Sequence, residues 1–68
     1  MRRFELSEGT SNKFWQIERK GTDVHVTFGR IGTNGQTQVK SFADDAAAAQ
    51  HVERLVQEKL GKGYREVS

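Results

Sequence analysis

The residues best suited to hold another molecule are Phe28, Gly29 and Arg30, which come just before a tight turn. The Phe28 ring offers a face on which a base or a sugar can stack. The Arg30 guanidinium presents a planar fork of donors that matches a phosphate. Gly29 has no side chain, so it would let another molecule approach the backbone closely. Because aromatic rings and cations together hold exposed nucleotides in many proteins, this triplet is a candidate nucleic-acid site.

The charge around this triplet is unevenly spread. The chain has 68 residues, with 11 basic and 9 acidic side chains and a net charge of +2, an excess too small to establish nucleic-acid binding. However, the stretch 24–43 contains Arg30 and Lys40 and no acid, which permits a local basic patch. Lys40 joins the candidate site because the hairpin register expected below sets it opposite Phe28. The simpler alternative is that Phe28 closes one end of the core and that Arg30 is merely solvated.

Other chemistry finds little support in the sequence. There is no cysteine, which excludes disulfides and thiolate metal sites, and the composition fits a reducing compartment such as the cytoplasm. His25 and His51 do not form a metal-ligand spacing, and no serine lies near a histidine–carboxylate pattern. The glycines do not form a phosphate loop that opens a helix. We therefore expect a non-enzymatic binding module without metal or cofactor.

The elements that position the triplet begin with a hairpin. The segments 13–20 and 24–31 alternate apolar and polar residues, and Gly21-Thr22 is typical of a two-residue type II′ loop. This register sets Trp15 opposite Phe28 and Ile17 opposite Val26, so that the large apolar side chains share one face.

The following turn contains Asn34-Gly35 and allows two registers. A two-residue loop sets Phe28 opposite Ser41. A three-residue loop, with Gly35 in the left-handed conformation, sets Phe28 opposite Lys40 and Val26 opposite Phe42. The second register keeps the apolar residues together, and we expect it for that reason, although Gly29 or Gly32 could host a bulge.

The remaining segments predict an α+β fold for a single domain over residues 1–68. Residues 3–6 form a first strand, expected at an edge, and 7–12 a long loop. Asp44 caps a helix that runs to about Leu60, with Gly61 just after its end. Residues 64–67 could add a short strand. The expected architecture is an antiparallel sheet of about four strands with one helix across one face.

Faces of these elements follow from the same periodicities. The expected helix stripe is Ala48, Val52, Leu55, Val56 and Leu60. It should pack on the sheet residues Trp15, Ile17, Val24, Val26 and Phe42. The opposite face of the sheet is expected to meet water and to carry Phe14, Gln16, Glu18, His25 and Thr27.

These motifs resemble the WGR domain family, which is named for a Trp-Gly-Arg triplet in a hairpin. Here the triplet region reads Phe28-Gly29-Arg30-Ile31-Gly32-Thr33, followed by Gly35-Gln36. Asn12-Lys13-Phe14-Trp15 is similar to the family's first common strand and Val39-Lys40-Ser41-Phe42 to the strand before its helix. Glu58-Lys59-Leu60-Gly61-Lys62-Gly63-Tyr64 matches the end of that helix. The resemblance covers nearly the whole chain and implies the sheet-and-helix fold expected above.

The family occurs in DNA-damage-activated poly(ADP-ribose) polymerases, where it binds DNA near a strand break. The resemblance implies that Phe28 and Arg30 contact a terminal nucleotide and that Gly29 allows its approach; Lys40 is added from the register. Phe28 replaces the triplet's tryptophan, which keeps a stacking face but loses the indole N–H. The sequence ends at Ser68 without a catalytic domain, so the resemblance implies neither ADP-ribosylation nor a relayed signal.

The resulting functional expectation is weak, sequence-independent binding of nucleic acid, at DNA ends or nicks, through Phe28, Arg30 and Lys40. The alternative is a protein-interaction module that uses the open sheet face around Phe14 and His25, or an edge strand. No apolar run is long enough for a membrane helix, so no membrane partner is expected.

Overall fold

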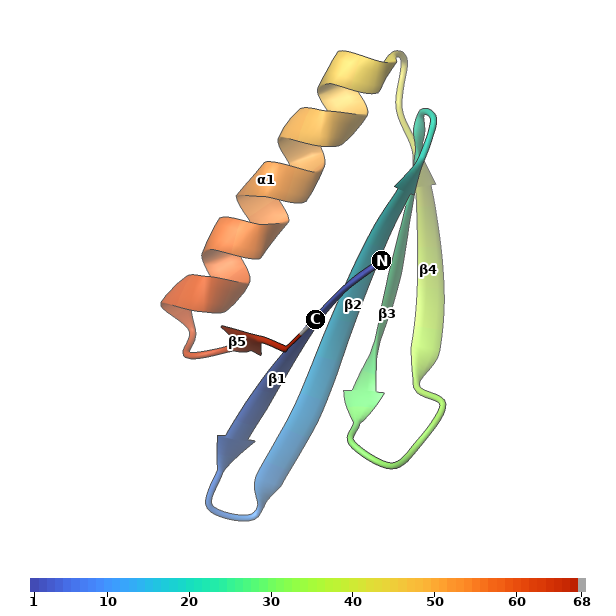
Figure 1. The fold of residues 1–68 in the computed structure, drawn as a ribbon. Coiled ribbons are helices and arrows are strands. Elements are labelled where there is room, and N and C mark those ends of the chain that lie inside the picture. The colour runs from blue at the N-terminus through green and yellow to red at the C-terminus, as the bar shows by residue number, and fades with distance from the viewer. Residues whose placement is uncertain (68) are drawn as a thin grey trace.

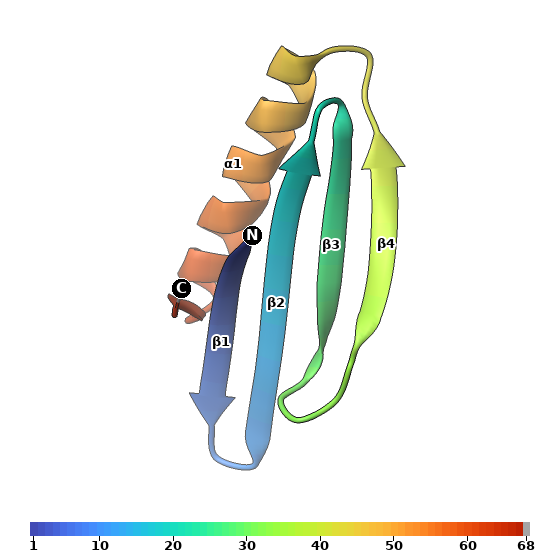
Figure 2. The same ribbon diagram turned by 45° about the vertical axis from the view of Figure 1, so that its right-hand side comes forward.

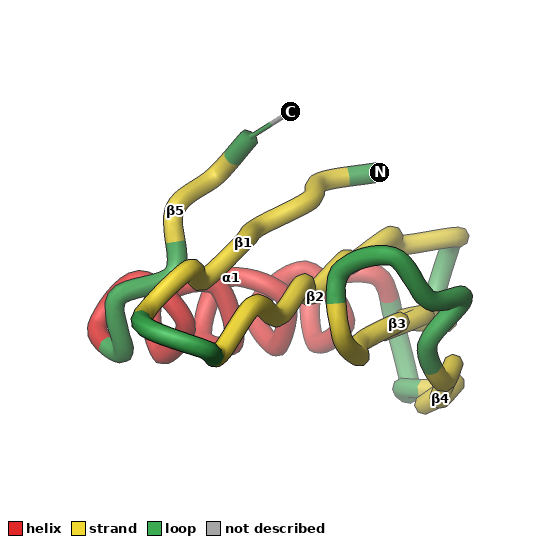
Figure 3. Tube along the Cα trace, turned by 90° about the horizontal axis from the view of Figure 1, so that it is seen from below, coloured by secondary structure: helices red, strands yellow, loops and turns green. Residues whose placement is uncertain are grey.

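The protein is described by a computed structural model that covers residues 1–67, and Ser68, the last residue of the expected domain, lies outside the described residues. Five strands and one helix follow one another along the chain (Figure 1). They are β1 (Arg2–Glu8), β2 (Ser11–Lys20), β3 (Asp23–Arg30), β4 (Gln36–Ser41), α1 (Asp45–Gly61) and β5 (Arg65–Glu66). The sheet is antiparallel with the order β4-β3-β2-β1-β5, so that β4 lies at the opposite edge from β5 (Figure 3). The expected α+β class is confirmed, and the C-terminal segment adds a fifth strand.

The central hairpin of β2 and β3 has the predicted register. Trp15 lies opposite Phe28 and Ile17 opposite Val26. The turn places Gly21 at a φ of +62°, and no residue other than glycine has a positive φ among the described residues. This pattern fits a type II′ turn, which needs a positive φ only at its first central residue.

The first strand is longer than expected and is not an edge. β1 pairs with β2 on one side and with β5 on the other. The expected loop over residues 7–12 is a tight turn instead, because Glu8 pairs with Ser11 and only Gly9 and Thr10 lie between the strands. Gly9 has a φ of +59°, which allows this short connection.

The β3–β4 connection differs from both predicted registers. Phe28 lies opposite Gln36, and Val24 lies opposite Lys40, so that the strands are joined by residues 31–35 rather than by a two- or three-residue loop. Asn34-Gly35 was the wrong place for the turn.

Backbone and hydroxyl contacts explain where this turn forms. The N–H of Thr33 donates to the Arg30 carbonyl at 3.1 Å, and the Thr33 hydroxyl donates to the same oxygen at 2.7 Å. Gly32 has a φ of +97° at the position where a type II turn requires it. The chain therefore turns at Ile31-Gly32, before Asn34-Gly35 is reached.

Both ends of α1 are closed by local hydrogen bonds. The carboxylate of Asp44 accepts from the N–H of Ala47 at 2.8 Å, as predicted for an N-cap. At the other end the left-handed residue is Gly63, with a φ of +98°, and not the expected Gly61. Tyr64 donates its N–H to the Lys59 carbonyl at 3.0 Å and Gly63 donates to Leu60 at 3.1 Å, which is the Schellman pattern.

The core lies between α1 and the β1–β2–β3 part of the sheet. Its buried members are Phe4, Trp15, Ile17, Val24, Ala48 and Val56. Figures 1 and 2 show that a loop leads from β4 past the β2–β3 turn to the start of α1, and that α1 then diverges from β3 and β4 toward the edge of the sheet formed by β1 and β5. Phe4 is therefore fully buried although it was not expected in the core, while the predicted stripe residue Leu60 is 43% exposed.

The sheet face away from α1 is not simply open to water. Phe14 lies on that face but is only 3% exposed. The guanidinium of Arg3 lies 4.5 Å from the centre of the Phe14 ring, and the backbone of Gly35 packs against the ring. The expectation of an exposed Phe14 was therefore wrong, because the 31–35 loop folds back over it.

The helix of the described residues has a length of 17 residues and is neither long enough nor apolar enough to cross a membrane.

Candidate functional site

The divergence of α1 from β3 and β4 leaves a groove between them. Its volume is about 1040 Å³. The floor is formed by β3 and β4 together with the N-terminal part of β2, and the C-terminal half of α1 forms one wall. All four predicted site residues line it: Phe28, Gly29, Arg30 and Lys40. Hereafter this feature is called the helix–sheet groove.

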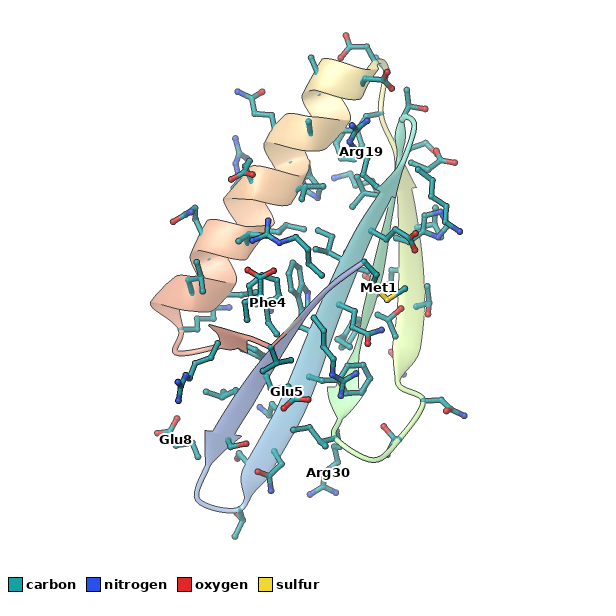
Figure 4. The ribbon with its side chains drawn as sticks, viewed as in Figure 1. Met1, Phe4, Glu5, Glu8, Arg19 and Arg30 are labelled. Carbon is teal, nitrogen blue, oxygen red and sulfur yellow. The ribbon has the colours of Figure 1, made fainter. Side chains whose placement is uncertain are left out.

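Phe28 and Arg30 lie on the same face of β3 because they are two residues apart in a strand. Phe28 is partly buried against the core, and Arg30 is exposed. Figure 4 shows Arg30 projecting at the end of the sheet where the 31–35 loop lies. The ring and the guanidinium are thus held next to each other at the wide end of the groove.

Lys40 lies farther from Phe28 than the predicted register implied. It is opposite Val24, four residues along β4 from the partner of Phe28, and this offset amounts to roughly 13 Å at the usual rise of a strand. Lys40 still faces the groove, because the true and the expected registers differ by an even number of residues. The two cations therefore mark opposite ends of the groove instead of one point.

Gly29 also has a role in the packing of the fold. It is paired with Phe14, so the side chain that it lacks would point away from the groove. A Cβ atom at Gly29 would lie 2.8 Å from the Cα atom of Gly35. At Gly35, a Cβ atom would lie 2.5 Å from the Phe28 carbonyl oxygen. The two glycines therefore allow the loop to close on the strand, which accounts for Gly29 without any bound molecule.

Lys13 is a groove residue that the sequence analysis missed. It is directly opposite Arg30 in the β2–β3 pairing and lines the groove. The register that set Trp15 opposite Phe28 also sets Lys13 opposite Arg30, so the signal was present. Like charges directly opposite each other destabilise a sheet, which makes this pair unfavourable unless an anion lies beside it.

The end of α1 brings two more cations to the wide end of the groove. Lys59 and Lys62 line it together with Tyr64. The Nζ atom of Lys59 lies 5.5 Å from the centre of the Trp15 ring and 5.2 Å from that of Tyr64. Burial lowers the pKa of the Lys59 ammonium, and its neighbours Lys62 and Lys13 lower it further. These contacts depend on the direction in which α1 crosses the sheet, which periodicity does not provide.

The narrow end of the groove contains a histidine. The His51 ring packs on the Phe42 ring, with the ring centroids 4.8 Å apart. The Nζ atom of Lys40 also lies near Phe42, at 5.5 Å from the centre of its ring. Burial lowers the pKa of His51, and the charges of Lys40 and Arg54 lower it further. His51 is thus held neutral near pH 7 and adds a polar group rather than a charge.

The cations of the groove have no ion-pair partner within residues 1–67. The salt bridges of this part of the chain join Arg2 to Glu66, Arg3 to Glu5 and Arg19 to Asp45, all away from the groove. Glu58 is the one carboxylate in the groove lining, against five Lys and Arg side chains. The groove is therefore a basic surface with an aromatic and aliphatic floor.

Metal-ligand clusters are not found in the part of the chain that the structure describes. No three His, Asp or Glu side chains there come close enough to hold an ion. His25 lies on the face of β3 away from the groove, opposite Val39, and His51 lies on α1. The basic groove with its aromatic and aliphatic floor is suited to binding an anionic ligand that exposes flat rings.

Comparisons with known proteins agree with the fold. Protein YehF of Escherichia coli is 46% identical over 66 residues, which cover 97% of this chain and 24% of YehF. The uncharacterized protein YfeS of the same organism is 34% identical over 65 residues, which cover 96% of this chain and 27% of YfeS. The chain thus spans only a minor part of the curated relatives that it matches.

A crystal structure of a Bacteroides fragilis protein superposes with a TM-score of 0.96 at 45% identity, covering 98% of this chain and 19% of the other. The family model described as the WGR domain matches residues 1–68 and indicates no catalytic family. The chain belongs to the WGR domain family.

Proposed function

We propose that this domain is a non-enzymatic module that binds nucleic acid in the cytoplasm, at DNA ends or nicks, through Phe28, Arg30 and Lys40. WGR domains in general bind nucleic acid, which supports the class of ligand. The observation that carries the proposal is that these three side chains line one groove whose cations lack ion-pair partners within the described chain. A phosphate in the groove would neutralise charges that the fold leaves uncompensated.

Chemistry assigns separate roles to the residues. Arg30 and Lys13, opposite each other, would bind one phosphate from two strands. Phe28 would present its ring to the terminal sugar or base. Lys40 would hold the backbone farther along the groove. With so few cations, the affinity should fall in the range of about 10⁻⁴ to 10⁻⁶ M that is typical of non-specific binding and should decrease steeply with salt.

Fluorescence anisotropy tests this proposal. A labelled nicked duplex is titrated with the domain at low and at physiological salt, with a closed circular duplex as competitor. We expect binding that weakens with salt and resists the circle. Arg30→Glu should abolish it. Lys20→Glu, the same charge reversal at the opposite end of the β2–β3 hairpin, should not. Affinity that survives Arg30→Glu would remove Arg30 from the site.

A protein-binding edge is the second candidate function. β4 is an edge strand, all six of its residues are exposed, and Val39 is 55% exposed. An extended peptide could add to such an edge. Val39→Lys should then remove a protein partner, whereas Arg30→Glu, which lies on β3 and not at this edge, should leave that partner bound.

A further inference from the structure

The helix–sheet groove is too small for a double helix. The whole domain measures 40 × 23 × 16 Å, and the groove occupies only the space between α1 and the strands β2, β3 and β4. Its volume, about 1040 Å³, is at the upper end of what small-molecule sites offer. A duplex could touch the rim of this groove but could not enter it.

The lining of the groove does not match the outside of a duplex. Its floor and walls include four partly buried apolar side chains, Val26, Phe28, Leu55 and Tyr64. The backbone of a duplex presents phosphates and sugars, while the flat faces of its bases are stacked inside. Apolar and aromatic walls become useful only to a ligand whose base faces are exposed, which is the property of an unpaired strand.

The polar groups follow the length of the groove. Lys13 and Arg30 lie at the wide end with Lys59 and Lys62, and Lys40 lies at the narrow end. Between the two ends, Gln38 faces the groove from β4, opposite Val26. Cations at both ends and an amide between them suit a ligand that carries several phosphates in a row and exposes hydrogen-bonding base edges.

We propose that the helix–sheet groove holds a single unpaired nucleic-acid strand, with bases on the Phe28 and Val26 floor and phosphates at the two cationic ends. The inference rests on the proposed function, which it narrows from nucleic acid in general to the unpaired end of a strand. A duplex end or nick would then be bound through nucleotides that have come out of the helix.

Three labelled probes separate the possibilities: a short oligothymidylate, a blunt-ended duplex of two separate strands and an abasic oligomer with the same number of phosphates as the oligothymidylate. We expect the oligothymidylate to bind about tenfold more tightly than the abasic oligomer, since stacking on aromatic side chains contributes roughly that factor per base. It should also bind more tightly than the blunt duplex.

A matched pair of variants tests whether the strand lies in the groove. Gln38→Glu adds a negative charge to the middle of the floor and should weaken oligothymidylate binding several-fold. Gln57→Glu adds the same charge to an exposed position of α1 that does not line the groove, and should have little effect. Both residues are exposed, so neither substitution is expected to disturb folding.

Each contrary outcome has its own meaning. If the blunt duplex binds as tightly as the oligothymidylate and Arg30→Glu abolishes both, the proposed function stands and the unpaired-strand inference is overturned. If the abasic oligomer binds as well as the oligothymidylate, contacts with bases are refuted. If no probe binds even at low salt, the proposed function fails and the inference fails with it.

Discussion

The two halves of the helix-facing side of the sheet have the same alternating pattern but different surroundings. In the half formed by β1 and β2, the side chains Phe4, Trp15 and Ile17 lie beneath α1 and are at most 3% exposed. In the other half, formed by β4 and the C-terminal part of β3, Phe28 is only partly buried and Lys40 is exposed. The difference comes from the path of α1, which diverges from β3 and β4 (Figure 1).

One fold would thus separate stability from the binding proposed above. The closed half excludes water from large apolar side chains, which is the main source of stability in so small a domain. The open half retains an aromatic ring beside cations without ion-pair partners among residues 1–67, which is costly for folding but useful for an anionic ligand.

The largest expected effect is on the two phenylalanines. Phe4→Ala should cost about 3–5 kcal/mol of unfolding free energy, the usual loss for a fully buried ring. Phe28→Ala should cost roughly half as much, because the ring is only partly buried, yet it should weaken nucleic-acid binding. Urea unfolding followed by Trp15 fluorescence compares them. Equal losses of stability would mean that the open half is part of the core.

A smaller loss is expected from the loop that closes on β3. Gly35→Ala should destabilise the domain by about 1–3 kcal/mol, because a positive φ is strained for alanine and its Cβ atom would meet the Phe28 carbonyl. Gly9→Ala is the matched control, since Gly9 has a positive φ but open space around its Cβ position. Thermal unfolding of the two variants should show the greater loss at Gly35; identical losses would show that the loop yields without strain.

The start of α1 sets where the helix leaves the sheet. Asp44→Ala removes the N-cap and should cost about 1 kcal/mol. Asp45→Ala should cost less, because its contact with Arg19 is 3.8 Å long and exposed. Circular dichroism during thermal unfolding measures both. A greater loss at Asp45 would contradict the assignment of the cap.

For the facing cations Lys13 and Arg30, the expected change in stability has the opposite sign. Lys13→Gln should leave the fold unchanged or stabilise it by about 0.2–1 kcal/mol, because it removes a like charge opposite Arg30. The same change should weaken nucleic-acid binding and lower the salt slope by about one unit. If Lys13→Gln destabilises the fold without affecting binding, the pair has a structural role and no ligand.

The smallest effect is expected from His51. Burial and the charges of Lys40 and Arg54 lower its pKa below 6.5, while Glu58 acts in the opposite direction. The unfolded chain therefore takes up a proton at His51 more readily than the folded chain does. The contribution of His51 to the free energy of unfolding is consequently fully present above pH 6.5 and is lost as the pH falls through the pKa that His51 has in the folded chain. The pH dependence of unfolding should become flatter in His51→Gln. An unchanged profile would show that other groups control it.

Local patterns predicted most of the fold. Alternation and the Gly21-Thr22 turn gave the correct β2–β3 register, and Asp44 was recognised as the cap of a helix of nearly the right length. The β3–β4 connection was wrong because Asn34-Gly35 is the stronger short hairpin signal, whereas the chain turns earlier through hydrogen bonds from Thr33. Which of the two adjacent glycine-containing turns forms depends on contacts of the loop with β2 and β3.

The candidate site was only partly predictable for the same reason. Phe28, Arg30 and Lys40 follow from residue types and strand faces, and the structure places all three in one groove. Lys59 and Lys62 join them only because of the angle at which α1 crosses the sheet. Gly29 was explained differently by the structure, since the space that it leaves is filled by Gly35.

The short strand β5 has a mechanical consequence. It pairs antiparallel with β1 at Phe4 and Glu5, and the Arg2 guanidinium donates two hydrogen bonds of 2.8 and 2.9 Å to the Glu66 carboxylate. The two ends of the domain consequently leave it side by side (Figures 1 and 2). Tension between them would peel β5 from β1 one hydrogen bond at a time, rather than shear the whole sheet. The Arg2–Glu66 ion pair would break first, while Phe4 and the closed half of the sheet stayed in place.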